Sequence, residues 1–222
     1  DLDDTLLDTG KYYHRQLDLV ISFIKEKFPE AGNSEDILDV YYSIDSESIE
    51  ANGYDKAHFP ESMVATFEHY CREYDYSASR EELEECAGIG WEVYARVPEK
   101  LNDIAETLEK LRENYGLILY TMGDAQIQLE KIAHHELEHW FDELHVVPLK
   151  ETHYLKKIAG FYPREQVMVV GDSLRGEIQP ALQLGMRAVY RKSNFPWSFH
   201  EVEVEGEFPT IKELPELFDL LP

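Results

Sequence analysis

Asp1-Leu2-Asp3-Asp4-Thr5-Leu6 (residues 1–6, DLDDTL) is the stretch that decides how the rest of the chain is interpreted. In an extended backbone, residues two apart point to the same side, so we expect Asp1 and Asp3 to face one small volume. Two carboxylates that close repel each other, and a shared proton or a bound cation relieves the repulsion. One can then act as a nucleophile while the other transfers a proton. The spacing alone is more often that of an acidic, frayed end of a chain.

Length and charge limit the classes of function. The 222 residues suffice for one sizeable core, or for a core with a smaller inserted domain. The content of 43% hydrophobic and 12% aromatic residues is typical of a folded protein. The formal net charge of −24 argues against nucleic acid or an anionic membrane as partner. A phosphorylated substrate would therefore need a local positive site, which a divalent cation supplies.

The two cysteines, Cys71 and Cys86, have no disulfide-framework spacing, and we expect both to be reduced and buried. The sequence shows no leader pattern and no apolar run near roughly 18 residues. We therefore expect a soluble, cytoplasmic protein.

Helical periodicity predicts an all-helical unit over residues 10–95. The predicted boundaries are Pro29 at the end of the first helix, Ser34 as the cap of the second, Pro60 at the start of the third, and a Ser79–Glu82 capping box before the fourth.

From residue 96 onward, short apolar runs alternate with helical patterns. The predicted strands are 117–120, 145–147, 167–170 and 187–190, and the predicted helices are 101–111, 125–141, 151–159 and 177–184. This alternation indicates an α/β fold with a parallel sheet covered by helices on both faces. Residues 201–205 are predicted to be a solvated edge segment.

Chemistry-bearing residues follow the predicted strands, where ligands bind in open parallel sheets. Thr121, Met122 and Gly123 follow the first strand and can offer a hydroxyl and backbone N–H groups to a phosphate. Lys150 follows the second strand, where its ammonium group can balance carboxylates. Asp172, with Glu177 five residues later, follows the third and brings oxygen ligands suited to Mg²⁺. Each signal alone is also typical of an ordinary turn or a surface residue.

Taken together, DLDDTL, YTMGD, Lys150 and VMVVGDSLRGE resemble the four motifs of the haloacid dehalogenase-like hydrolase superfamily, in its capped phosphatase subclass. The resemblance covers residues 1–9 and about 96–192. It implies a Rossmann-like catalytic core of residues 1–9 and 96–222, with residues 10–95 as an inserted helical cap.

The resemblance also implies roles for single residues. Asp1 would attack phosphorus and form an aspartyl-phosphate, and Asp3 would serve as acid and base. Thr121 and the Gly123 backbone would hold phosphoryl oxygens, with Lys150 offsetting their charge. The implied Mg²⁺ ligands are Asp1, the Asp3 carbonyl, Asp172 and, directly or in support, Glu177.

The sequence departs from the family pattern at three places. Glu177 stands where Asp is commoner, and Met122 stands where a polar residue is frequent. The family also has a hydrophobic strand before its first aspartate, and we expect such a segment to precede Asp1. In the helical unit, Lys56 and His58 are candidates for substrate binding, although both are also typical of an ordinary loop.

A rival pattern is His135-Glu136-Leu137-Glu138-His139, which matches the HExxH motif of zinc proteases. On a helix over 125–141, both histidines would lie on the polar side, away from the core, so a solvated face is favoured over a zinc site.

Within the superfamily, Asp3 favours phosphate chemistry, because a halide leaving group needs no acid. A phosphonatase would need a Schiff-base lysine, and no lysine of residues 10–95 is marked for that role. The sequence thus predicts a Mg²⁺-dependent phosphoric monoester hydrolase acting on a small phosphorylated metabolite. A phosphomutase or phosphotransferase of the superfamily, or an inactive ligand-binding module, remains an alternative, and the sequence leaves monomer and homodimer open.

Overall fold

Two units make up the computed structural model, which describes residues 1–160 and 162–221. One unit comprises residues 1–10 and 98–222, and the other comprises residues 11–97. Among the described residues, none of the helices combines the length and the apolar character that crossing a membrane requires.

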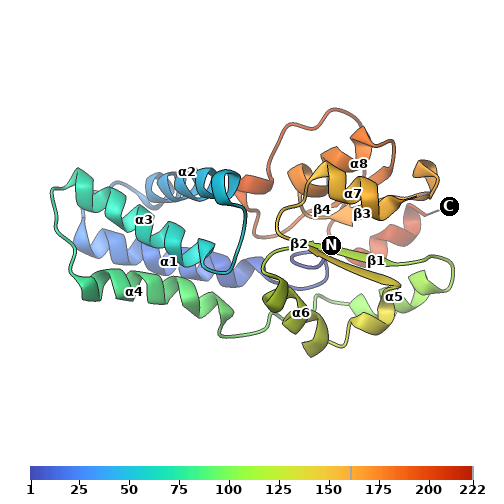
Figure 1. Cartoon of the computed structure of the whole chain (residues 1–222), viewed down its shortest axis with the longest axis horizontal. Helices are drawn as coiled ribbons and strands as arrows, with labels where there is room; N and C mark the ends of the chain where they lie inside the picture. The colour runs from blue at the N-terminus through green and yellow to red at the C-terminus, as the bar shows by residue number, and fades with distance from the viewer. Residues whose placement is uncertain (161, 222) are drawn as a thin grey trace. The chain divides into compact units, whose positions relative to one another are not determined.

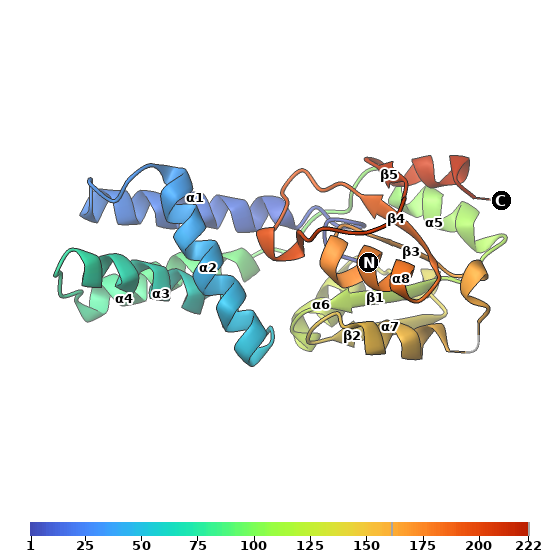
Figure 2. The same cartoon turned by 90° about the horizontal axis from the view of Figure 1, so that it is seen from above.

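The unit of residues 11–97 is built from helices, as its periodicity predicts. They are α1 (Gly10–Lys27), α2 (Ser34–Asn52), α3 (His58–Glu73) and α4 (Arg80–Trp91), followed by the 3₁₀ turn Glu92–Tyr94. Figure 2 shows α2 crossing α1, while α3 and α4 run side by side. The predicted Ser79–Glu82 capping box is confirmed before α4.

Two helix starts in this unit differ from the prediction. The cap of α2 is Asn33 and not Ser34, because the residue three positions after Asn33 is Asp36, which completes a capping box. The third helix begins at His58, two residues before Pro60, so the proline lies inside the first turn, where its missing N–H costs no hydrogen bond.

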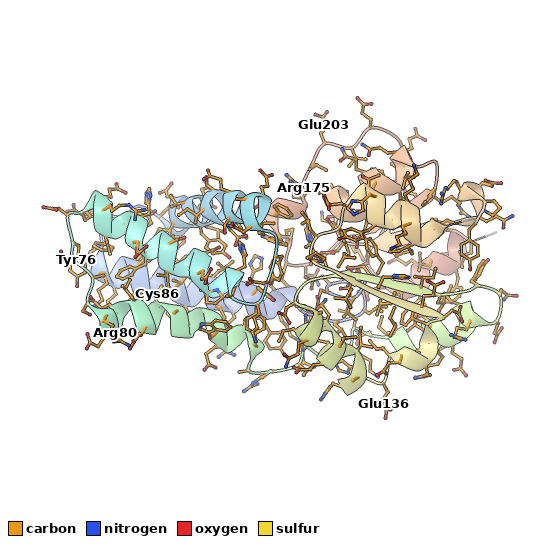
Figure 3. The ribbon with its side chains drawn as sticks, viewed as in Figure 1. Tyr76, Arg80, Cys86, Glu136, Arg175 and Glu203 are labelled. Atoms are coloured by element: carbon orange, nitrogen blue, oxygen red, sulfur yellow. The ribbon has the colours of Figure 1, made fainter. Side chains whose placement is uncertain are left out.

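Aromatic side chains fill the centre of the helical unit. Phe67 is fully buried, and its ring centroid lies 4.9 Å from that of Phe23 and 6.0 Å from that of Phe28. Cys71 and Cys86 are both buried and unbridged, as predicted. Figure 3 shows Cys86 inside this unit, and Tyr76 and Arg80 toward its end.

The strands of the other unit all pair in parallel, as the alternation of strands and helices predicts. The strand β1 (Ile118–Met122) pairs with β2 (Glu143–Val147). A second sheet has the order β3 (Met168–Gly171), β4 (Arg187–Arg191) and β5 (Thr210–Ile211). The described strands therefore form two parallel sheets instead of one, and a cavity of about 640 Å³ is lined by residues of both β1 and β3.

Helices cover both faces of these strands (Figure 1). Alternate residues of a strand point to opposite faces, so Leu119 joins one apolar cluster and Tyr120 another. The first cluster contains residues of α5 (Ile104–Arg112) and α6 (Ala125–His134), and the second contains residues of α7 (Thr152–Ala159) and α8 (Gln179–Gln183). The predicted Rossmann-like class, with a parallel arrangement between helical layers, is confirmed.

The predicted helix over 125–141 is wrong in its second half. α6 ends at His134, Glu136 takes a left-handed conformation with φ of 53°, and a separate 3₁₀ turn covers Glu138–Trp140. Leu137 is buried just past the break, which anchors the new chain direction.

The predicted helix over 177–184 begins earlier, because a single turn of π-helix (the π-turn), Leu174–Ile178, precedes α8. The remaining 3₁₀ segments are Arg164–Gln166, Ser198–His200 and Leu214–Asp219. Residues 201–205 lie outside helices and strands.

Candidate active site

The first residues of the chain form a tight loop beside the end of β3. The backbone nitrogen of Asp1 donates to the Val170 carbonyl at 3.2 Å. Asp4 then adopts a left-handed backbone with φ of 53°, and its carbonyl accepts from the buried Arg191 guanidinium at 2.6 Å. Its carboxylate accepts from the Gly10 N–H at 2.8 Å, which closes the loop. These contacts fix the direction in which the Asp1 and Asp3 side chains leave the backbone.

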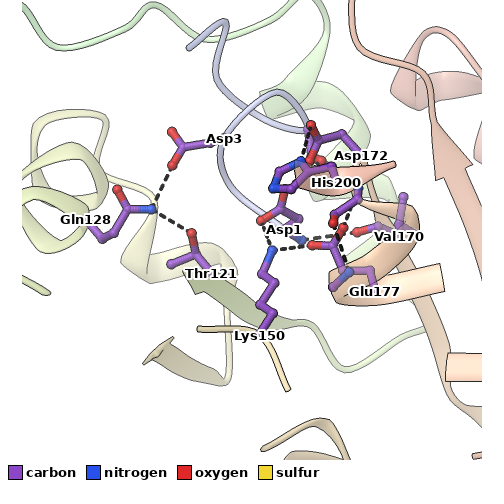
Figure 4. Close-up of polar contacts among 12 residues, drawn as sticks. Asp1, Asp3, Thr121, Gln128, Lys150, Val170, Asp172, Glu177 and His200 are labelled. Atoms are coloured by element: carbon purple, nitrogen blue, oxygen red, sulfur yellow. Dashed lines mark hydrogen bonds and ion pairs between the residues drawn. The ribbon is translucent and has the colours of Figure 1, made fainter. Parts of the chain in front are cut away.

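Asp1 lies in a buried ionic cluster. The Lys150 ammonium group donates both to the Asp1 carboxylate and to that of Glu177 (Figure 4). The Thr5 hydroxyl donates to the other oxygen of Asp1 at 3.0 Å. The side chains of Asp1 and Lys150 are only 4% and 6% exposed, so little water screens their attraction. The predicted pairing of Lys150 with the first carboxylate is therefore present in the geometry.

The turn after β3 places Glu177 in this cluster. The Ser173 N–H donates to the Glu177 carboxylate at 2.8 Å. A Cβ atom on Gly171 would overlap that carboxyl group, so only glycine leaves room for it. A Cβ atom on Gly176 would lie 3.2 Å from the Cβ of Lys150, so the π-turn also passes close to the lysine.

Three carboxylates form the one group of potential metal ligands found among the described residues. Oxygen atoms of Asp1, Asp172 and Glu177 all lie within 4.8 Å of one another. Burial, and then the negative charge of Glu177, raise the pKa of Asp172 to about 8. Such crowding is relieved by a divalent cation, and carboxylate oxygens are the ligands that Mg²⁺ prefers. The donor set therefore fits a magnesium ion.

His200 lies next to this group and was not singled out by the sequence. Its Nδ1 is 3.5 Å from an oxygen of Asp172, and burial lowers its pKa to about 4. It belongs to a 3₁₀ turn far along the chain, so no local pattern links it to the motifs.

The Asp3 carboxylate points away from Asp1, toward α6 (Figure 4). Lys131 donates to its Oδ1 at 2.8 Å, Thr9 donates to the same oxygen at 2.6 Å, and Gln128 donates to its Oδ2 at 2.8 Å. Burial opposes ionisation, but the Lys131 charge and the hydrogen bonds from Lys131, Thr9 and Gln128 outweigh it and lower the pKa of Asp3. The two carboxylates thus have separate partners, contrary to the shared volume expected from an extended chain, because residues 1–7 form a turn and not an extended strand.

The residues at the end of β1 are brought to the same region. Thr121 is 1% exposed, and its hydroxyl oxygen accepts from Gln128 at 2.7 Å. Gly123 has φ of 142°, and its N–H donates to the Val147 carbonyl at 3.0 Å, so that N–H already has an acceptor. Met122 is half-buried beside Val147 of the neighbouring strand.

The remaining sequence candidates have other surroundings. Lys56 and His58 belong to the helical unit, where Lys56 is exposed and His58 is buried with its Nε2 2.8 Å from Asp45 Oδ1. The histidines of the HExxH pattern do not share a helix, because α6 ends at His134, just before His135. The His135 ring N–H donates to the Pro98 carbonyl at 2.6 Å. The geometry therefore does not favour a zinc site there.

The chain is similar to known proteins in both sequence and fold. The family model of haloacid dehalogenase-like hydrolases matches residues 1–185. Human N-acylneuraminate-9-phosphatase is 27% identical, with 85% of this chain and 78% of that protein covered. A haloacid dehalogenase-like hydrolase from Xanthomonas campestris has a similar fold, with a TM-score of 0.74, 19% identity, and 97% and 85% of the two chains covered. The haloacid dehalogenase-like hydrolase YfnB from Bacillus subtilis, solved bound to magnesium, has a TM-score of 0.62 and 18% identity, with 99% of this chain and 95% of that chain covered.

Proposed function

This chain belongs to the haloacid dehalogenase-like hydrolase family, and we propose that it is a Mg²⁺-dependent phosphatase that hydrolyses a small phosphomonoester. One observation carries the proposal. Asp1, one of the three clustered carboxylates, is paired with Lys150. Two residues later, the Asp3 carboxylate has hydrogen-bond donors of its own. A nucleophile and a separate acid–base group are what the cleavage of a phosphate ester needs.

In the proposed reaction, a carboxylate oxygen of Asp1 attacks phosphorus while the bond from phosphorus to the ester oxygen breaks. Asp3, which takes up a proton from solvent before this step, gives that proton to the departing oxygen, and the product alcohol leaves. A water molecule then attacks the phosphorus of the aspartyl-phosphate and loses its proton to Asp3, and the bond to Asp1 breaks. Inorganic phosphate is released, with both aspartates restored.

The other residues of the site act on charge and orientation. Lys150 would neutralise negative charge near Asp1, and the buried Thr121 hydroxyl would donate to a phosphoryl oxygen. Asp1, Asp172 and Glu177 would hold Mg²⁺, with the Asp3 carbonyl as a further proposed ligand. When bound, the ion supplies positive charge that stabilises the phosphoryl group as charge develops on it.

The relatives suggest a substrate class to test first. The human relative is named for the 9-phosphate of an N-acylneuraminate, which is the phosphate ester of an acidic sugar. We propose an acidic sugar phosphate as the substrate class, and residues 11–97 as a cap that supplies specificity. Lys56, a sequence candidate for substrate binding, is exposed in that unit, and its positive charge would suit an anionic substrate.

The test is phosphate release from N-acylneuraminate 9-phosphate, from simple sugar phosphates and from 4-nitrophenyl phosphate, with Mg²⁺ or with a chelator. Asp1→Asn removes the nucleophile, and Asp142→Asn is the matched control, because Asp142 lies on the surface beside Arg112. We expect Mg²⁺-dependent release that is lost in Asp1→Asn and retained in the control. Folded protein that releases no phosphate from any ester would contradict the proposal, and transfer of phosphate within a sugar would favour a mutase.

A further inference from the structure

The helix α6 carries two buried polar side chains that have no role in the mechanism described so far. Gln128 is 2% exposed and Lys131 is 7% exposed. They are three positions apart, so they lie on one face of the helix. A buried lysine is rare without a compensating charge, and Lys131 finds one in Asp3, at 2.8 Å.

The hydrogen-bonding capacity of Gln128 fixes the orientation of its amide. Lys131 can only donate, so the amide oxygen of Gln128 accepts from it, at 2.8 Å. The two N–H bonds of the amide then point the other way, one to Asp3 Oδ2 at 2.8 Å and one to Thr121 Oγ1 at 2.7 Å. One side chain therefore joins the acid–base carboxylate to the hydroxyl at the end of β1.

This arrangement has a consequence for Thr121. Its oxygen already accepts a hydrogen bond from Gln128, so its own proton is left for another acceptor. A phosphoryl oxygen is such an acceptor. Gly123, with φ of 142°, lies against the Gln128 side chain, and a Cβ atom there would be 3.3 Å from its Cγ, so a larger residue at this position would crowd Gln128.

We propose that Gln128 and Lys131 are positioning residues that hold the Asp3 carboxyl group for proton transfer and orient the Thr121 hydroxyl as a donor to the substrate. This inference rests on the proposed phosphatase function. It assigns α6 a part in leaving-group protonation, which is separate from the cluster of Asp1, Lys150 and the metal ligands.

Rates on substrates with different leaving groups distinguish a positioning role from a merely structural role. The phenol of 4-nitrophenyl phosphate is acidic and leaves with little help from an acid, whereas the alkoxide of an alkyl phosphate needs a proton as it departs. If Gln128 and Lys131 position the acid, removing either one will slow alkyl phosphates more than aryl phosphates. A general loss of folded protein would slow both equally.

The experiment compares kcat and KM on an alkyl phosphate and on 4-nitrophenyl phosphate for Gln128→Leu, Lys131→Met, Lys131→Arg and Asp3→Asn. We expect Gln128→Leu to lower kcat about 100-fold on the alkyl ester and less than about 10-fold on the aryl ester, as general acid catalysis is commonly worth ~10²–10⁴-fold. Lys131→Met is expected to have a smaller selective effect, because losing the charge also makes Asp3 easier to protonate. Lys131→Arg keeps the charge and is expected to retain more of the alkyl rate than Lys131→Met. Combining Gln128→Leu with Asp3→Asn is expected to add little to Asp3→Asn alone.

The matched controls are Gln126→Leu, on the exposed side of the same helix, and Lys157→Met, an exposed lysine of α7. Neither is expected to alter the ratio of the two rates. Equal losses on both esters, or no loss, in Gln128→Leu while Asp3→Asn remains selective would overturn the positioning role and leave the phosphatase proposal intact. Folded wild-type protein with no activity on either ester would overturn both.

Discussion

The buried contact between His58 and Asp45 makes a sharp prediction about stability. His58 is 5% exposed and Asp45 is 1% exposed, and their side chains meet at 2.8 Å. The Tyr41 hydroxyl donates to the same Asp45 oxygen at 3.0 Å. Removing one partner of a buried pair commonly costs about 3–5 kcal/mol, because the other partner is left uncompensated.

We expect His58→Ala to lower the free energy of unfolding by about 3 kcal/mol, near the lower end of that range, because Tyr41 remains as a donor to Asp45. The measurement is urea unfolding followed by circular dichroism, with separate fits if the two units unfold in separate transitions. The matched control is His69→Ala on the same helix. His69 is 43% exposed and 3.6 Å from Glu73, so its loss is expected to change stability by less than about 0.5 kcal/mol.

A loss below about 1 kcal/mol for His58→Ala, or an equal loss for both variants, would refute this reasoning. His58 would then be free for the substrate-binding role that its position near Pro60 suggested, and a raised KM with unchanged stability would be the corresponding signature.

Three further predictions follow from single residues. Gly171→Ala places a methyl group in the space of the Glu177 carboxyl, and we expect about a 100-fold loss of kcat/KM, measured over a range of Mg²⁺ concentrations. Burial raises the pKa of Cys86 to about 12, so iodoacetamide is expected to label it negligibly in folded protein and readily in urea, as followed by mass spectrometry. The pKa of Glu82 is lowered from 4.5 to about 2, mainly by a hydrogen bond from Lys27. The ionised Glu82 therefore stabilises the folded protein fully above pH 4.5, and this contribution is lost as the pH falls toward 2. We expect Glu82→Gln to make stability less dependent on pH in that interval.

Each of these has a contrary outcome. Gly88→Ala is the control for Gly171→Ala, because a Cβ atom there meets nothing within 4 Å, and equal activity of the two variants would contradict the steric account. Rapid labelling of Cys86 without denaturant would contradict its burial. Unchanged acid unfolding in Glu82→Gln would show that the surface hydrogen bonds around it contribute nothing.

Local patterns in the sequence were sufficient to predict the strands β1 to β4 and the strand ends near which the candidate site residues lie. The motif residues follow directly after apolar runs, so predicting a strand also predicts where Thr121, Lys150 and Asp172 lie. β5, by contrast, has two residues, too few to show a period. The break that follows α6, at Glu136, carries no glycine or proline to mark it.

The partners of Asp3 were missed for a different reason. Gln128 and Lys131 are polar residues on a helix and look like a solvated face until the tertiary structure places Asp3 against them. The only local signal is their spacing of three residues, shortly after Thr121. His58 was likewise interpreted as a loop residue, because its partner Asp45 lies on another helix, 13 positions earlier. Contacts between distant segments decide both cases, and periodicity does not report them.

The most direct test of the central proposal is to look for the phosphoryl group on Asp1. A single turnover with an alkyl phosphate and Mg²⁺ would be quenched in acid within milliseconds, and the peptide that contains residues 1–6 would be analysed by mass spectrometry. We predict a phosphoryl group on Asp1 that appears and decays at the rate of turnover and is absent from Asp1→Asn. Phosphate release at full rate with no phosphorylated Asp1, or with Asp1→Asn still active, would contradict the mechanism.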